Sequence, residues 1–149
     1  MSFAIETVFS HWKRLSNGQF ESKTDLIRDL QAKGYYCVLI FVGLSSVDLS
    51  ILRVGIRREQ GGHDVSLQKL RARFPRTQLA VGHAADVADM TLMFDNSRSL
   101  NQAFAMVRVQ KQGEVLFDCR DTRYKVERET RALARRWLDK VVGPFPDEL

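Results

Sequence analysis

Apolar residues form short continuous runs in some parts of the chain and recur at helical spacing in others. The run YYCVLIFVGL (35–44) is continuous and rich in β-branched and aromatic residues, which predicts a strand buried on both faces, as in a parallel sheet. The other predicted strands lie at 2–7, at 90–97 and in a hairpin over 103–119 that turns at Gln112-Gly113. Helical spacing, together with glycine and proline stops, predicts helices over 21–34, 46–60, 66–73, 76–87 and 123–142.

Strands that alternate with helices predict an α/β fold, with a mostly parallel sheet flanked by helices and with a C-terminal β-hairpin and long helix. The length of 149 residues suits a single domain, 1–149. In such sheets a ligand lies at the carboxyl ends of the strands. Polar residues follow three of the predicted strands at that end: Glu6-Thr7, Ser45-Ser46 and Asp95-Asn96-Ser97.

Composition excludes several classes of protein. Hydrophobic residues make up 44% and charged residues 28%, as in a globular domain rather than a disordered chain. No apolar run approaches the ~18 residues that a membrane span requires, and the first residues do not resemble a signal peptide. Cys37 and Cys119 are too few for a disulfide framework or a zinc cluster. We therefore expect a cytoplasmic protein with no membrane contact and no metal site.

Positive charge gathers in the stretch RREQGGHDVSLQKLRARFPR (57–76). The formal net charge of +5 suits anionic partners such as nucleotides, nucleic acid and phosphorylated sugars. Arg71, Arg73 and Arg76 cluster around a proline, and each guanidinium is a planar fork of donors suited to phosphate oxygens. Gly61-Gly62 can act as a hinge. The pattern favours a helical lid over about 46–87 that closes on phosphates; the alternative is a solvated basic surface.

The other candidate residues each have a functional and a structural interpretation. Glu6 and Thr7 could hydrogen-bond the hydroxyls of a polar substrate, or cap a following helix. His63 could donate to a phosphate, act as an acid or base, or orient its turn. Asp95 and Asn96 could form a polar strand end beside a site, or a turn rich in Asp, Asn and Ser. The residues alone assign no catalytic group.

The last predicted helix, 123–142, is basic along its polar face and could touch nucleic acid. It lacks aromatic residues interleaved with the basic ones, and no nucleic-acid-binding motif precedes it. The sequence therefore argues against nucleic acid as the main partner.

Four stretches, taken in order, resemble the zeta toxin family of P-loop kinases, which includes UDP-N-acetylglucosamine kinases and related predicted ABC-type ATPases. They are FAIETVFSH, GYYCVLIFVGLSSVDLSILRV, GGHDVSLQKLRARFPRT and FDNS, and they extend from residue 3 to about residue 97. Family members tend to have a proline where this chain has Ser66. The resemblance implies that Glu6 and Thr7 hold the acceptor, a UDP-sugar in the best-known branch. It also implies that Arg73 and Arg76, with Arg71 and His63, clamp the phosphates of a nucleotide.

The family pattern also requires parts that this sequence lacks. ATP and Mg²⁺, the cofactors that the resemblance implies, are held by a P-loop of the form GxxxxGKS or GxxxxGKT, and no such motif occurs here. The P-loop strand and an aspartate that acts as base lie upstream of the ET motif, with which this sequence begins. We therefore expect a P-loop-kinase-like fragment that is inactive alone, and we expect ATP binding to be weakened by the missing loop.

Loss of the P-loop strand would leave exposed strand edges. The expected partners are therefore a nucleotide or UDP-sugar, a P-loop-bearing chain or an antitoxin, or a second copy of this chain. Two alternatives stay open: a non-catalytic nucleotide- or protein-binding regulatory module, and a basic nucleic-acid-binding domain.

Overall fold

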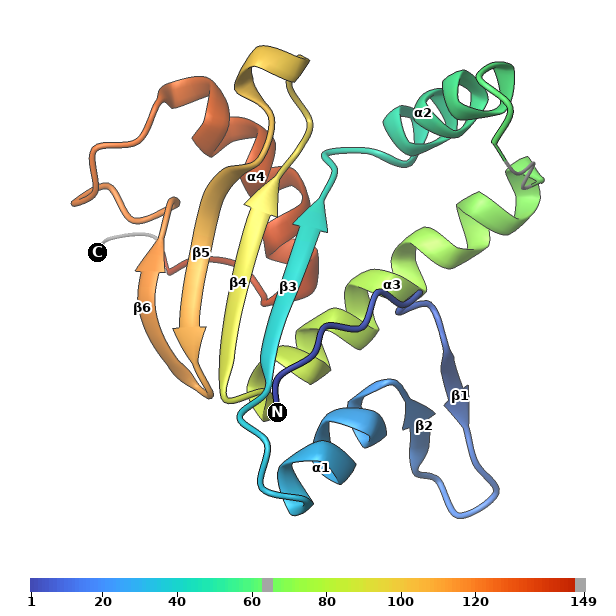
Figure 1. Ribbon diagram of the computed structural model, residues 1–149. Coiled ribbons are helices and arrows are strands. Elements are labelled where there is room, and N and C mark those ends of the chain that lie inside the picture. The colour runs from blue at the N-terminus through green and yellow to red at the C-terminus, as the bar shows by residue number, and fades with distance from the viewer. Residues whose placement is uncertain (63–65, 147–149) are drawn as a thin grey trace.

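The computed structural model describes residues 1–62 and 66–146, and its centre is a four-stranded sheet (Figure 1). The strands lie in the order β3 (Val38–Gly43), β4 (Met90–Asp95), β5 (Ala105–Lys111) and β6 (Glu114–Asp118). β3 and β4 pair in parallel, whereas β4–β5 and β5–β6 are antiparallel pairs. The α/β class is confirmed, as are the strands near 35–44 and 90–97 and the hairpin that turns at Gln112-Gly113.

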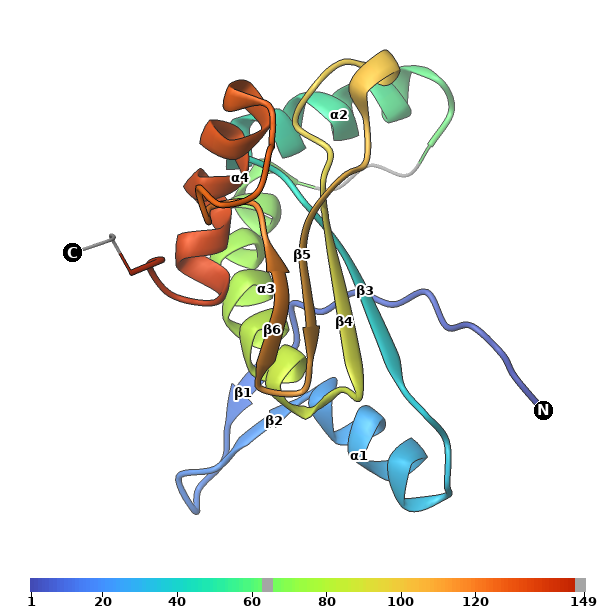
Figure 2. The same ribbon diagram turned by 90° about the vertical axis from the view of Figure 1, so that its left-hand side faces the viewer.

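Two helices, α3 (Leu67–Val87) and α4 (Arg128–Val141), cover one face of this sheet and contact each other. Figure 2 shows the sheet edge-on, with both helices on the same side of it. α1 (Thr24–Ala32) packs beside α3 near the amino ends of β3 and β4, and α2 (Val47–Glu59) lies beyond their carboxyl ends (Figure 1). A short 3-10 helix, η1 (Leu100–Gln102), precedes β5. The fold is thus a sheet with one helical layer.

The hydrophobic core lies between the sheet and the two helices. Val81 and Ala85 of α3, Met93 of β4, and Trp137 and Leu138 of α4 are all buried there. Burial of these side chains away from water is the main term that holds the helical layer to the sheet.

Trp137 is the largest fully buried side chain, and its position accounts for the glycine at the end of β3. The indole N–H donates to Asp95 Oδ2 at 2.8 Å, and the ring meets Phe41 edge-on with centroids 5.6 Å apart. A Cβ at Gly43 would come within 2.4 Å of the indole ring. Gly43 therefore gives Trp137 the space to reach the strand ends.

One face of the sheet is open to solvent. The expectation that the 35–44 strand is buried on both faces is wrong, because Val38, Ile40 and Val42 are 49%, 62% and 40% exposed. The residues paired with them across β4 and β5 continue an apolar surface, which we call the open face. The open face comprises Val38, Ile40, Val42, Leu92, Phe94 and Met106. A continuous apolar run needs cover on both sides to be buried, and no helix among the described residues covers this side (Figure 2).

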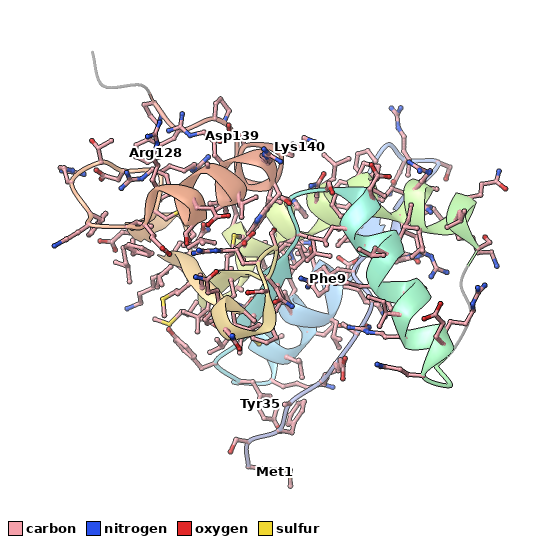
Figure 3. The ribbon with its side chains drawn as sticks, turned by 90° about the horizontal axis from the view of Figure 1, so that it is seen from above. Met1, Phe9, Tyr35, Arg128, Asp139 and Lys140 are labelled. Atoms are coloured by element: carbon pink, nitrogen blue, oxygen red, sulfur yellow. The ribbon has the colours of Figure 1, made fainter. Side chains whose placement is uncertain are left out.

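The expected strand at 2–7 is not formed. Residues 1–8 are exposed, and in the described part of the chain no backbone hydrogen bond joins them to a strand. Phe3 contacts Tyr35 edge-on, with centroids 5.3 Å apart, and Phe9 packs into the interior. Seen from above, Phe9 lies within the molecule and Met1 at its periphery (Figure 3). Although the outer edge of β3 is unpaired, residues 2–7 do not pair with it, so they do not form a strand.

An antiparallel hairpin follows instead, and the sequence did not predict it. It consists of β1 (Trp12–Arg14) and β2 (Phe20–Ser22), and Gly18 takes a positive φ of 83° in its turn. Trp12 stacks on Phe20 with centroids 4.8 Å apart, and its other ring contact is His83 of α3 at 5.4 Å. These aromatic contacts attach the hairpin to the helical layer.

The expected helices over 66–73 and 76–87 are one continuous helix, α3, with Pro75 inside it. Pro75 removes one N–H from the helical ladder, but burial of residues such as Gln78 and Val81 holds the second half of the helix in line. The helix expected over 123–142 begins later, at Arg128. The helices near 21–34 and 46–60 are confirmed as α1 and α2, and Gly34 has the positive φ of 86° expected after a helix end.

No helix in the described ranges is both long enough and apolar enough to cross a membrane.

Candidate functional site

The carboxyl ends of β3 and β4 lie side by side, as their parallel pairing requires. The Ser45 amide donates to Ser97 Oγ at 2.8 Å, and the Asn96 amide donates to the Gly43 carbonyl at 3.0 Å. Figure 3 looks down on this end of the sheet. The polar residues that follow these two strands are therefore brought together, as the sequence predicted.

Asp95 faces the interior rather than solvent. It is 1% exposed, and both carboxylate oxygens accept hydrogen bonds. One accepts from the Ser97 amide at 3.0 Å, and the other accepts from the Ser97 hydroxyl and the Trp137 indole, each at 2.8 Å. This geometry favours the structural interpretation of Asp95 as an anchor for the strand-end turn, with Asn96 half-buried beside it.

A cavity of about 260 Å³ lies beside these strand ends, and we call it the apolar hollow. Its walls come from the end of β3, from α2, from α3 and from Trp137 of α4. The lining includes Phe41, Val42, Leu70, Phe74 and Trp137. Val8 and Arg73 also line it, so the hollow ends in a positive charge. Apolar walls with one charged group are typical of sites for small organic ligands.

A second, more open cavity of about 560 Å³ adjoins the first, and we call it the basic hollow. Val8 and Arg73 line both cavities. The basic hollow is otherwise lined by Ser10, His11, Trp12, Lys13 and Arg76. Its lining contains no carboxylate, so the electrostatic potential inside favours an anion.

Arg73 occupies the junction of the two hollows. It is half-buried, and within the described residues its guanidinium has no hydrogen bond or ion pair. Arg76 is exposed, and its Nε donates to the Ala72 carbonyl at 3.1 Å. Arg71 differs from both, because its Nη2 lies 3.2 Å from Asp48 Oδ1 and it lines neither hollow. The structure thus brings two of the three candidate arginines to a cavity and uses the third to link α3 to α2.

Two further sequence candidates, Glu6 and Thr7, do not line these cavities. Glu6 and Thr7 are exposed on the unpaired N-terminal segment, next to Val8 but outside the lining of both hollows. His63 lies outside the described residues.

The sequence missed two basic residues of the site, His11 and Lys13. His11 Nε2 lies 2.7 Å from Glu21 Oε1 across the β1–β2 hairpin, and the Lys13 side chain has no hydrogen bond or ion pair with another described residue. No periodicity in SHWKR signals a strand, and the approach of this segment to α3 is a tertiary contact between distant parts of the chain. The only available signal was the concentration of basic and aromatic residues.

Other arginines gather near the end of β6, but these arginines form ion pairs with carboxylates. Arg120 donates to Asp118 through Nε (3.0 Å) and Nη2 (2.8 Å), and to Asp139 through Nη1 (2.7 Å), and Arg108 also donates to Asp118. Burial raises the pKa of Asp118, but the hydrogen bonds and charge of Arg120, together with Arg108, outweigh burial and hold that pKa below its usual range. Since its acids and bases neutralise one another, we assign this cluster to stability.

Neither cysteine is placed as a nucleophile. Cys37 and Cys119 are both free thiols, and Cys119 is buried. Burial, with the charge of Asp118, raises the pKa of Cys119 to about 12, which leaves it protonated at neutral pH.

Comparisons with protein-family models, with curated proteins and with solved structures find no match for this chain. The candidate site consists of an apolar hollow and a basic hollow that meet at Arg73, near the carboxyl end of β3.

Proposed function

We propose that the chain is a zeta-toxin-like kinase fragment whose phosphate-clamping arginines bind a nucleotide or UDP-sugar, and that it transfers no phosphoryl group alone. The observation that supports binding most directly is the position of Arg73. Its guanidinium is half-buried at the junction of the two hollows, without an ion pair to another described residue. A partly desolvated charge is stabilised by an anionic partner, and phosphate oxygens match the geometry of a guanidinium.

The adjoining hollows suit the two parts of such a ligand. Phosphates would lie in the basic hollow with Arg73 and Arg76, and a base or sugar would lie against the apolar walls. The volumes of about 260 and 560 Å³ are of the order of small-molecule sites, which are commonly about 300–1,000 Å³. The strand-end turn that Asp95 anchors supports one wall of the apolar hollow through Trp137.

The residues present do not fit Mg²⁺. Among the described residues no group of three or more His, Cys, Asp or Glu side chains could hold a metal ion. Asp95, the acid nearest the strand ends, already accepts hydrogen bonds at both oxygens. Phosphoryl transfer depends on a P-loop lysine and a metal to stabilise charge, and this sequence contains no P-loop motif. We therefore propose that activity requires a P-loop-bearing partner.

We expect Arg73→Ala to abolish nucleotide binding. Ligand at about 100 times its Kd stabilises a protein by about 2.7 kcal/mol, which is roughly 5–11 °C in Tm for a chain of this size. Differential scanning fluorimetry with ATP and with UDP-N-acetylglucosamine should show such a shift for the wild type and none for Arg73→Ala. Arg71→Ala is the matched control, because Arg71 lies on the same helix but pairs with Asp48 outside both hollows. No shift of the wild type with either ligand, or an unchanged shift of Arg73→Ala, would contradict the proposal.

A second candidate function is that of a binding module whose partner is a second copy of the chain. The open face favours this function. β3 is an edge strand of the sheet, its sequence VLIFVG has no charge or proline, and Ile40 is 62% exposed. Natural edge strands are usually protected by charges, prolines or bulges. We expect sedimentation velocity to show concentration-dependent dimers of the wild type and monomers of Ile40→Lys. Leu79→Lys, which changes an exposed leucine on α3, should dimerise as the wild type does. A wild type that is monomeric at every concentration would eliminate this candidate.

A further inference from the structure

We infer that Lys13 of the β1–β2 hairpin is a specificity-determining residue, which makes the basic hollow a site for a diphosphate rather than for a single phosphate. This inference rests on the proposed function, because it assigns the anionic part of the same ligand. Lys13 and Arg76 bind the outer phosphate, and Arg73 binds the phosphate next to the apolar hollow.

The basic hollow has two walls from distant parts of the chain. Residues 8–13 form one wall, and α3 forms the other with Arg73 and Arg76. Trp12 fixes the hairpin wall, since its ring meets His83 of α3 edge-on at 5.4 Å and stacks on Phe20. Phe9, which packs on both core clusters, anchors the chain just before the hairpin. The hairpin wall is therefore held against α3 by its own apolar contacts.

Strand alternation determines which hairpin residues share a face. Trp12 and Phe20 lie on the face that carries the aromatic contacts, and Lys13 lies on the opposite face with its cross-strand neighbour Glu21. Glu21 is already engaged by His11, at 2.7 Å. Lys13 itself forms no ion pair with another described side chain, although it lines a cavity that two arginines also line.

The charge and size of the hollow indicate more than one phosphate. Three permanent cations, Lys13, Arg73 and Arg76, line it, and its lining contains no carboxylate. Its volume of about 560 Å³ lies within the range of small-molecule sites and leaves room for more than one phosphate group. None of these three cations forms an ion pair with a described residue, and a ligand with several negative charges can contact more of them than a single phosphate can.

Arg73 sets the order of the groups along the ligand. Because Arg73 lines both hollows, the phosphate that it binds is the one adjacent to the apolar part of the ligand. Lys13 and Arg76 line only the basic hollow, so they contact the next phosphate along. The pyrophosphate group of a nucleoside diphosphate or of a UDP-sugar has this arrangement.

The test is calorimetric titration of the wild type, Lys13→Ala and Arg14→Ala with AMP, ADP and UDP-N-acetylglucosamine, in a buffer with EDTA and at fixed ionic strength. A charge-assisted hydrogen bond changes affinity by about tenfold or more, so the wild type should prefer ADP to AMP by at least that factor. Because Arg76 remains, Lys13→Ala should reduce this preference by about tenfold and keep its affinity for AMP. Arg14→Ala removes the neighbouring charge on the other face of the hairpin, outside the lining, and should behave as the wild type.

The outcomes separate this inference from the proposed function. If Lys13→Ala keeps the preference for ADP and also binds UDP-N-acetylglucosamine as tightly as the wild type does, or if Arg14→Ala loses affinity equally, the diphosphate subsite is overturned while nucleotide binding stands. If Lys13→Ala lowers the affinity for UDP-N-acetylglucosamine but not the affinity for ADP, the pyrophosphate group that binds in this site is that of the UDP-sugar. If the wild type binds none of the three ligands, both the inference and the proposed function fail. Circular dichroism of both variants establishes that they are folded.

Discussion

Replacing Gly82 by alanine is expected to destabilise the protein by about 3 kcal/mol or more, which is at the upper end of the usual cost of overpacking. Gly82 lies within α3, where α4 ends against it, and a Cβ there would be 2.0 Å from the carbonyl oxygen of Val141. That oxygen belongs to the backbone, so no side-chain rotation relieves the contact. α4 must move away, and with it the buried Trp137 and Leu138.

Thermal or urea unfolding followed by circular dichroism measures this effect, which should lower Tm by roughly 6–12 °C. Gly55→Ala is the matched control, because Gly55 is also inside a helix, α2, and no atom lies within 4 Å of a Cβ built there. Alanine at such a position should stabilise by about 0.5–1 kcal/mol. The same substitution is thus expected to have opposite signs at the two sites. A Gly82→Ala variant as stable as Gly55→Ala would show that α3 and α4 do not pack as described.

Arg120→Ala is expected to cost about 3–5 kcal/mol at neutral pH, because it leaves a buried carboxylate without its main partner. Arg120 is 2% exposed, and it donates two hydrogen bonds to Asp118 and one each to Asp139 and the Gly143 carbonyl. Arg108 remains beside Asp118 but cannot replace all of these bonds. Arg135→Ala, on the exposed surface of α4, is the control and should change stability little.

This destabilisation should depend on pH in a defined direction. The pKa of Asp118 is lowered in the folded protein, so the unfolded state binds more protons near the usual carboxyl pKa of about 4. The stability that ionised Asp118 contributes is therefore present above that pH and is lost as the pH falls below it. Protonation also relieves the unpaired carboxylate of the variant. Urea unfolding at pH 7 and at acidic pH should show a smaller difference between wild type and Arg120→Ala at acidic pH. A difference that is constant with pH would contradict the role of Asp118.

The elements that the sequence predicted are those whose apolar pattern is long and uninterrupted. The run 35–44 and the run 90–97 became parallel neighbours, and Gly34 ended a helix as expected. Burial on both faces of β3 was wrong because it depends on what covers the strand, which a single run does not encode. The strand at 2–7 was wrong for a similar reason, since a strand forms only where another strand pairs with it.

Helix-breaking residues in the sequence also had less effect on the fold than tertiary packing had. Pro75 indicated two helices, but the buried residues that follow it keep α3 continuous. For the site, the cluster of arginines indicated Arg73 and Arg76 because an arginine pattern is visible in the sequence itself. Lys13 was missed because its approach to Arg73 joins segments about sixty residues apart. That approach depends on the docking of Trp12 against His83, which no local pattern reveals.

The construction of the basic hollow from a docked hairpin and a helix has a thermodynamic consequence. Residues 1–8 are exposed, and Phe9 and Trp12 are the side chains that attach this end of the chain to the core and to α3, so local opening of the N-terminal segment breaks few buried contacts. A ligand that bridges Lys13 and Arg73 also opposes that opening. Part of the intrinsic binding free energy is then spent on conformational order in the N-terminal segment, and the observed affinity reflects how often the segment is already docked.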